Sequence, residues 1–351
     1  MEKFLCGIIL LLCVVSCKTK SNSGNVKGQD INIELSKLDS LLRDTAFAMR
    51  IAEGQELSYY TTQGQQAPAF FSGPDSLVKK SYKEEKIAIN LAGFYAVECG
   101  IGTLSEQKGA TPVMLLQKIV NKALDSNEVL LLNRFANATW KAGQPFRGLD
   151  RITRDNFTVA EFLNKAEIQK DVDQVVAAAS MLLDSMQHVS DASREVQLQR
   201  INQLLKDKQY AYDMARHMEA AYYKGQNKPV PMFLSPKEDT MSVQKSAREE
   251  KIAINLAGFY ALECGIGYLV KTQHLLPSEI LKSITSDSIS QKKKQLLERF
   301  ANATWKAGQP FRSLDRITRE IFMPFDLLPK EEIDKDWDQI KSAAVMVQKT
   351  L

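Results

Sequence analysis

The feature that most constrains this chain of 351 residues is an internal repeat at an offset of 165 residues. Two long blocks recur, one with 20 of 23 positions identical and the other with 23 of 27 identical. These blocks are residues 80–102 with 245–267, and residues 131–157 with 296–322. A shorter Lys-Asp-x-Asp-Gln match begins at Lys170 and again at Lys335. A period this long indicates two copies of one domain rather than a solenoid of short repeats.

The residue pattern within each copy predicts helices. Gly and Pro number 17 and 11, which is too few for a turn-rich β-sandwich. Apolar side chains recur at steps of three and four residues, and no run shows the clear alternation of a half-buried strand. We therefore predict an all-α fold of two tandem duplicated α-helical bundles, over residues 31–190 and 191–351, joined end to end.

Caps and helix breakers place the expected helices. Thr111 followed by Pro112 is typical of an N-cap and a first helical residue. Gly100 and Gly102 are expected to end the preceding helix. The expected helices of the first copy cover residues 31–60, run from Ser76 or Ser81 to Glu98, begin at Thr111, and cover residues 127–142, 146–154 and 167–187.

The N-terminus has the pattern of an export signal. The apolar run at residues 4–15 is too short to span a bilayer and suits a signal-peptide core. The Val-Val-Ser-Cys tetrapeptide at residues 14–17 resembles the lipobox of bacterial lipoproteins, in which the Cys is acylated before cleavage. The resemblance implies a signal peptide over 1–16, a lipidated Cys17 and a flexible polar tether over 17–30. An ordinary secretory signal or an uncleaved anchor is the alternative.

This resemblance implies a protein of the cell envelope that is held to a membrane through the acylated Cys17. The next residues include Lys18 and Lys20 rather than an acidic cluster, which favours a periplasm-facing protein. Of five cysteines, only Cys99 and Cys264 remain for the folded part, and an oxidising compartment would permit them to pair. The net charge of +4 is too balanced to indicate nucleic acid as a partner.

A glutamate inside the most apolar segment of each copy is a candidate for an ion pair. Glu98 ends a run that is apolar nearly all round and is therefore predicted to be buried. A buried carboxylate needs a cation or hydrogen-bond donors. We expect Glu98 to meet Arg134 or Lys141 of the same copy. The equivalent expectation for the second copy is Glu263 with Arg299 or Lys306. The alternative to a ligand site is a structural ion pair that fixes the helix register.

Each copy also carries three arginines at helical spacing. Arg147, Arg151 and Arg154 stand at i, i+4 and i+7. The second copy repeats them as Arg312, Arg316 and Arg319. If the segment is helical, the three guanidinium groups share one face and can bind a carboxylate, phosphate or sulfate. The alternative is a solvated face whose arginines pair with neighbouring carboxylates.

Familiar catalytic and metal-binding signatures are missing from the sequence. Only three His are present, and there is no CxxC, HExxH or glycine-rich phosphate loop. The run Gly93-Phe94-Tyr95-Ala96-Val97-Glu98 is similar to the G-x-H-x-x-E motif of imelysin-like proteins, which are exported, duplicated helical bundles linked to iron uptake. The resemblance implies a metal-associated module, although Tyr95 and Tyr260 stand where that family has His.

Together these patterns predict a lipid-anchored, non-enzymatic binding or scaffold protein of the cell envelope, with two equivalent polar sites for an anionic small molecule or a partner protein. No cofactor, metal ligand or catalytic residue is assigned. The alternatives are an imelysin-like iron-associated module and a hydrolase that depends on glutamate. The candidate ligand-binding residues are Glu98, Arg134, Asn137, Lys141, Arg147, Arg151 and Arg154 in the first copy, and Glu263, Arg299, Asn302, Lys306, Arg312, Arg316 and Arg319 in the second.

Overall fold

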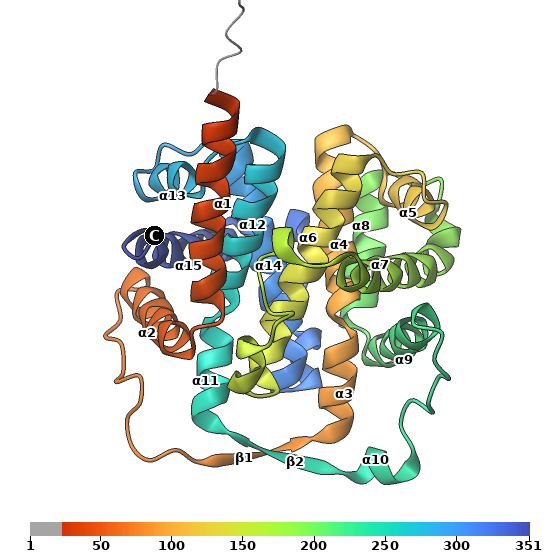
Figure 1. The fold of residues 1–351 in the computed structure, drawn as a ribbon. Coiled ribbons are helices and arrows are strands. Elements are labelled where there is room, and N and C mark those ends of the chain that lie inside the picture. The colour runs from red at the N-terminus through yellow and green to blue at the C-terminus, as the bar shows by residue number, and fades with distance from the viewer. Residues whose placement is uncertain (1–22) are drawn as a thin grey trace, which may run out of the picture.

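The computed structural model describes residues 23–351 of the chain (Figure 1). The predicted signal peptide over 1–16 and the predicted lipidation of Cys17 lie outside the described residues. Both therefore stay predictions.

Part of the predicted tether over 17–30 is helical rather than flexible, because helix α1 already begins at Ser23. Ile31 packs against the hydrophobic core. Lys27 Nζ lies 3.5 Å from the Glu279 carboxylate on a neighbouring helix. The described part of the predicted tether, residues 23–30, is therefore helical and touches the second copy through Lys27.

Helices account for almost all of the regular structure, so the predicted all-α class is confirmed. The first copy contains α1 (Ser23–Leu42), α2 (Thr45–Thr62), β1 (Leu77–Ser81), α3 (Tyr82–Asn90), α4 (Ala92–Lys108), α5 (Pro112–Val120), α6 (Ser126–Gly143) and α7 (Lys165–Met186). The second contains α8 (Arg194–Lys206), α9 (Lys208–Gly225), α10 (Pro236–Thr240), β2 (Ser242–Ser246), α11 (Ala247–Asn255), α12 (Ala257–Gln273), α13 (Pro277–Thr285), α14 (Gln291–Arg312) and α15 (Lys330–Gln348). Short 3₁₀ turns lie at Gln144–Phe146, Leu149–Thr153, Ala160–Phe162, Gln187–Val189, Leu314–Thr318 and Phe325–Leu327.

Side-chain caps begin several helices where the sequence indicates. Thr111 caps α5 and Pro112 is its first residue, so this predicted start is confirmed. Ser81 caps α3 by accepting a hydrogen bond from the third backbone N–H of the helix. Asp125 and Glu128 form a reciprocal capping box at the start of α6. Local chemistry therefore determines these boundaries.

Two helix boundaries differ from the prediction. The single helix expected over 31–60 is two helices, because Asp44 accepts hydrogen bonds from two backbone N–H groups and so begins α2. Gly100 and Gly102 do not end α4, which continues to Lys108 and closes at Gly109 with φ +65°.

A short antiparallel ribbon joins the two copies, although no strand was predicted. Its register places Leu77 opposite Ser246, and Lys79 opposite Gln244. Since 244 equals 79 plus 165, equivalent residues of the two copies meet at the centre of the ribbon. The strands form because the copies pair with one another, which a pattern read along one segment does not reveal.

Equivalent residues also meet inside the protein. The Phe135 and Phe300 rings stack with centroids 4.2 Å apart, and the Phe146 and Phe311 rings stack at 5.3 Å. Each pair again differs by 165 residues. These contacts relate the two copies by an approximate twofold axis, as in a symmetric homodimer whose subunits share one interface.

The first two helices of each copy pack against the other copy (Figure 1). α2 packs against α11 and α15, and α9 packs against α3 and α7. Gln55 Nε2, on α2, donates to the backbone oxygen of Gln339, on α15, at 3.0 Å. Separate bundles over 31–190 and 191–351 joined end to end are therefore a wrong expectation, because one continuous hydrophobic core includes both copies.

The most apolar helices lie at the centre of this core. Tyr82–Lys108 and Ala247–Gln273 are long and apolar enough to cross a membrane, each with a mean hydropathy of 1.4. The fold buries 89% and 78% of these windows. Packing against the neighbouring helices therefore accounts for their apolar surface.

Candidate functional site

Two buried ion pairs link the copies at the centre of the molecule. Lys306 Nζ, on α14, lies 2.7 Å from Glu98 Oε2 on α4. Lys141 Nζ, on α6, lies 2.6 Å from Glu263 Oε2 on α12. The four side chains are at most 2% exposed. The expected pairing of Glu98 with Arg134 or Lys141 is therefore wrong, because its cation comes from the other copy. The expectation for Glu263 fails in the same way.

The two lysines stay charged in this interior. Burial acts to lower the pKa of Lys141, but the neighbouring acidic groups together, with the Glu263 carboxylate first among them, outweigh it, so the pKa stands above its ordinary value. For Lys306, burial also acts to lower the pKa, but the surrounding acidic groups, including the Glu98 carboxylate, together raise it. Each lysine is thus fully committed to its pair, which makes these pairs structural rather than ligand-binding.

A thiol completes each ion pair. Cys99 Sγ donates to Glu98 Oε2 at 3.1 Å, and Cys264 Sγ donates to Glu263 Oε2 at the same distance. Both cysteines are free and buried, so they do not pair with one another. Burial raises the pKa of each thiol well above its ordinary value, and the adjacent glutamate raises it further. The thiols therefore stay protonated and unreactive.

The arginines predicted beside these glutamates have carboxylate partners of their own. Arg134 Nη2 lies 2.7 Å from Glu161 Oε1. Arg299 contacts Asp326 through two nitrogens, at 3.1 and 2.7 Å, and Glu106 at 2.5 Å. Arg134 and Arg299 therefore stabilise the fold and carry no unpaired charge to attract an anion.

Gly102 and Gly267 make room for these arginine pairs. A Cβ at Gly102 would lie 3.2 Å from Asp326 Oδ2. A Cβ at Gly267 would lie 2.8 Å from Glu161 Oε1. Each glycine lies in one copy and the carboxylate in the other, so the glycines expected to end a helix instead permit close contact between copies.

The two asparagines lie beside the thiols. Cys264 Sγ is 3.6 Å from Asn137 Oδ1, and Cys99 Sγ is 4.0 Å from Asn302 Oδ1. Asn137 also reaches the wall of a cavity between α6, α7 and α9. The predicted grouping of Glu98 with the asparagine and lysine of its own copy is therefore wrong, because each buried glutamate lies with the lysine and asparagine of the other copy.

The geometry of the described residues supports neither the imelysin-like iron-associated module nor the glutamate-dependent hydrolase. The Tyr95 ring packs edge-to-face on Phe322 at 5.5 Å, and its buried hydroxyl has no hydrogen-bond partner within residues 23–351. The same part of the chain contains no group of three or more His, Cys, Asp or Glu placed to hold a metal. Glu98 is buried and engaged by Lys306, so its carboxylate is closed to a substrate.

The first arginine cluster comprises Arg147, Arg151 and Arg154. The expected helix is instead a pair of 3₁₀ turns with Gly148 between them. Burial, followed by the positive charges of Arg151 and Arg154, lowers the pKa of Arg147. The exposed contact of 3.6 Å between Arg154 and Asp150 is the only ion pair of this cluster within the described chain.

The second cluster, Arg312, Arg316 and Arg319, repeats this arrangement. Burial, followed by the Arg316 charge, lowers the pKa of Arg312 to about 10. Among the described residues, the buried Nε–H of Arg312 has no hydrogen-bond partner, and the Nε–H of Arg147 has none either. Arg134 and Arg299 also have an Nε–H without an acceptor in the described chain, but their charges are paired, so the arginine clusters differ from them in holding unpaired positive charge beside the unused donor.

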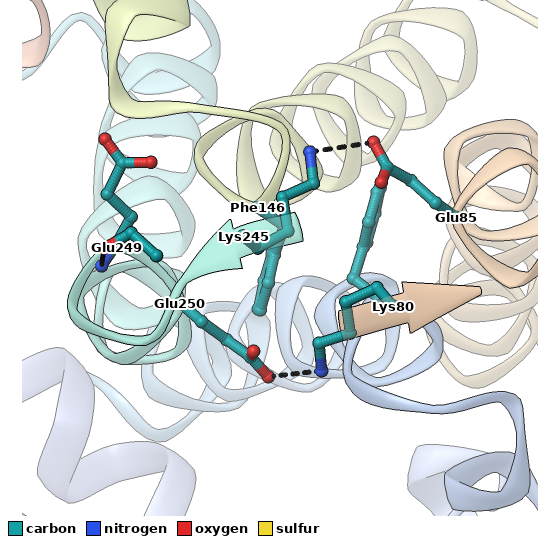
Figure 2. A pocket seen from close by; sticks show the side chains of 8 residues that line it. Lys80, Glu85, Phe146, Lys245, Glu249 and Glu250 are labelled. Atoms are coloured by element: carbon teal, nitrogen blue, oxygen red, sulfur yellow. Dashed lines mark hydrogen bonds and ion pairs between the residues drawn. The ribbon is translucent and has the colours of Figure 1, made fainter. Parts of the chain in front are cut away.

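Two reciprocal lysine–glutamate ion pairs lie beside the ribbon (Figure 2). The pairs are Lys80 with Glu250 at 2.9 Å and Lys245 with Glu85 at 3.1 Å. Lys245 Nζ also donates to the backbone oxygen of Arg147 at 3.1 Å, and Lys80 Nζ donates to that of Arg312 at 3.0 Å. The pocket between them has a volume of about 10 Å³, which is room for one water molecule. The pocket is therefore too small for a ligand, and the ion pairs around it hold the two copies together.

Two carboxylates that the prediction did not include lie beside the buried lysines. Burial, followed by the charge of Glu167, raises the pKa of Asp171 to about 7. Its equivalent in the second copy is Asp336. Burial raises the pKa of Asp336 well above its ordinary value. The identical Lys-Asp-x-Asp-Gln sequence in both copies was the signal that could have found them.

Comparison with known proteins gives no assignment. No family model, no curated protein and no solved structure matches this chain. The function proposed below therefore depends on the geometry of the described residues.

Breaking one crossed ion pair should destabilise the whole protein. In Lys306→Ala, Glu98 stays buried without a cation, so the free energy of unfolding should fall by about 3–5 kcal/mol. Guanidinium unfolding followed by circular dichroism measures this. The double change Lys306→Met with Glu98→Leu should recover most of the loss.

The matched control for this measurement is Lys341→Ala, which removes an exposed ion pair with Asp287. It should cost less than about 1 kcal/mol. A loss for Lys306→Ala no larger than that of the control would contradict a structural role for the buried pair.

The Asp171 carboxyl should make stability depend on pH. Its pKa is about 7 in the folded protein against an ordinary value of 3.8, so the folded protein binds this proton more tightly. The contribution of this group to the free energy of unfolding is therefore fully present below about pH 4 and is lost as the pH rises through about 7.

Asp171→Asn should stabilise the protein by about 1–3 kcal/mol near pH 8 and by little near pH 4. Guanidinium unfolding at the two pH values tests this, and equal changes at both would refute it.

Proposed function

We propose that this is a non-enzymatic binding or scaffold protein, anchored in the cell envelope by lipid on Cys17, with two equivalent arginine sites for an anionic group. The supporting observation is the pair of arginine clusters, whose half-buried members Arg147 and Arg312 each have a donor without an acceptor in the described structure. A bound carboxylate, phosphate or sulfate would supply the acceptor and offset the repulsion between neighbouring guanidinium groups.

The position of the clusters favours a ligand from the aqueous side over a lipid headgroup. Both clusters lie against the segments fixed by the ribbon, and the ribbon is at the end opposite the start of α1 (Figure 1). If Cys17 carries the lipid, only five residues lie between it and Ser23, a span of about 20 Å at most. The membrane would then lie near the start of α1, and the arginine sites would face away from it.

The approximate twofold axis gives the proposal a bivalent form. Each copy contributes one cluster from the same segment, so the two sites have the same residue types in the same order. A partner with two anionic groups at the matching separation would bind far more tightly than one with a single group, because its second contact is intramolecular. A partner protein with acidic or phosphorylated side chains fits this arrangement, as does a small anion taken up twice.

Removing one arginine from each cluster should abolish anion binding. We expect calorimetric titration of the full chain with inorganic phosphate at low salt to show two equivalent sites. Arg147→Ala or Arg312→Ala should each remove one site, and the double variant should remove both, since a hydrogen bond to a charged group contributes about 1.5–3 kcal/mol. Arg216→Ala, an exposed arginine beside Asp213, is the matched control. Phosphate binding that survives in the double variant would sink the proposal.

The anchor is tested separately. Cys17→Ser removes the acylation site, so the protein should move from the membrane fraction to the soluble fraction. Immunoblotting of fractionated cells of a host that processes lipoproteins measures this, with Cys99→Ser as the control. Unchanged membrane association of Cys17→Ser would show that the lipoprotein prediction is wrong, and it would leave the arginine sites untouched.

A further inference from the structure

The first copy contains a polar cavity that takes no part in the ion pairs or the arginine clusters. It lies between α6, α7 and α9 and has a volume of about 110 Å³. That is room for several water molecules, and therefore for one small molecule rather than an extended chain. The lining residues are Asn137, Trp140, Asn156, Leu163, Glu167, Lys170, Asp171, Gln174 and Tyr222.

The lining combines amide groups with aromatic rings. Asn137, Asn156 and Gln174 are amides, each with a carbonyl acceptor and an amino donor, and Asn137 Oδ1 already accepts from Cys264 Sγ. Trp140 and Tyr222 supply apolar ring faces and a further N–H and O–H. A ligand that satisfies this set must both donate and accept hydrogen bonds around an apolar frame.

The charges of the cavity select against an anion. Lys170 Nζ lies 2.7 Å from Glu167 Oε1, so these two charges offset one another. Asp171 is the remaining carboxyl group of the lining, and burial, followed by the charge of Glu167, raises its pKa to about 7. With two carboxyl groups and one ammonium group, the lining disfavours an anion.

The second copy supplies a natural comparison. The residue equivalent to Asn156 is Ile321, which removes one of the three amides. The residue equivalent to Asp171 is Asp336, and burial raises the pKa of both carboxyl groups. The other lining residues of α6 and α7 recur unchanged at the offset of 165, so the two copies differ in this lining at Asn156.

We propose that the cavity of the first copy binds one neutral, polyhydroxylated ring, a monosaccharide or the terminal sugar of a longer glycan. Each hydroxyl group both donates and accepts, which matches the amides of Asn137, Asn156 and Gln174. The C–H faces of the ring pack against Trp140 and Tyr222. This site is independent of the anion sites, since it uses none of their arginines.

Ligand-observed saturation-transfer NMR on the full chain tests this inference. The probes are glucose, galactose and N-acetylglucosamine at millimolar concentration, with a chitin disaccharide to distinguish a free sugar from the end of a glycan. At least one probe should receive saturation, with a millimolar dissociation constant. Asn156→Ile, which installs the residue of the second copy, should weaken that binding at least about tenfold, because an amide donor and acceptor of the cavity wall are lost.

Two further variants decide between outcomes. Ile321→Asn changes the equivalent position of the other copy and should leave binding unchanged, as should Arg147→Ala. If Asn156→Ile lowers the melting temperature strongly, Gln174→Ala takes its place and should weaken binding as well. No saturation of any sugar probe would overturn the inference, and so would binding that persists in both cavity variants. Saturation of methylammonium but not of the sugars would overturn the ligand class.

Discussion

A lysine removed from water must keep a carboxylate beside it, and in this protein each buried lysine takes that carboxylate from the other repeat. Burying both partners costs desolvation free energy that only close, well-directed contacts offset. The contacts of 2.6 and 2.7 Å, each completed by a thiol, meet that requirement. Because α4 and α12 must present Glu98 and Glu263 to lysines of the opposite copy, the register of the four central helices is defined.

The rest of the architecture is consistent with this constraint. Equivalent phenylalanines stack across the same axis, and the ribbon pairs equivalent strands beneath it. The first two helices of each copy then cover the core of the other, so one hydrophobic core is shared. The same interlocking places one arginine cluster in each copy at equivalent positions. Lys80 and Lys245 donate hydrogen bonds to the backbone oxygens of Arg312 and Arg147. The sites are thus a consequence of how the copies interlock.

The sequence predicted the helical class, the Thr111–Pro112 helix start and the need of Glu98 for a cation. It did not predict which lysine would supply it, because Lys141 and Lys306 stand in identical blocks and no local pattern distinguishes partners within a copy from partners between copies. The ribbon was missed for the same reason, since each strand is stabilised only by its equivalent. The prediction of a flexible tether did not anticipate the helix over residues 23–30, whose Lys27 lies beside Glu279 of the second copy.

The arginine clusters show a different limit. Their spacing predicted one helical face, whereas the chain forms 3₁₀ turns around Gly148, and the charges of Arg151 and Arg154 still act on Arg147. The cavity of the first copy was not predicted, because α6, α7 and α9 come together only in the fold. Composition and spacing identify residue types for chemistry, and the interlocking of the copies determines which of them stay accessible.

Disulfide trapping tests the crossed arrangement most directly. A Cβ placed at Gly54, on α2, would contact the Met346 side chain on α15. The residue equivalent to Met346 in the first copy is Met181, on α7. We predict that Gly54→Cys with Met346→Cys forms an intramolecular disulfide on mild oxidation, detected by mass spectrometry, and that Gly54→Cys with Met181→Cys does not. A disulfide that forms in the second double variant but not in the first would contradict the interlocked fold.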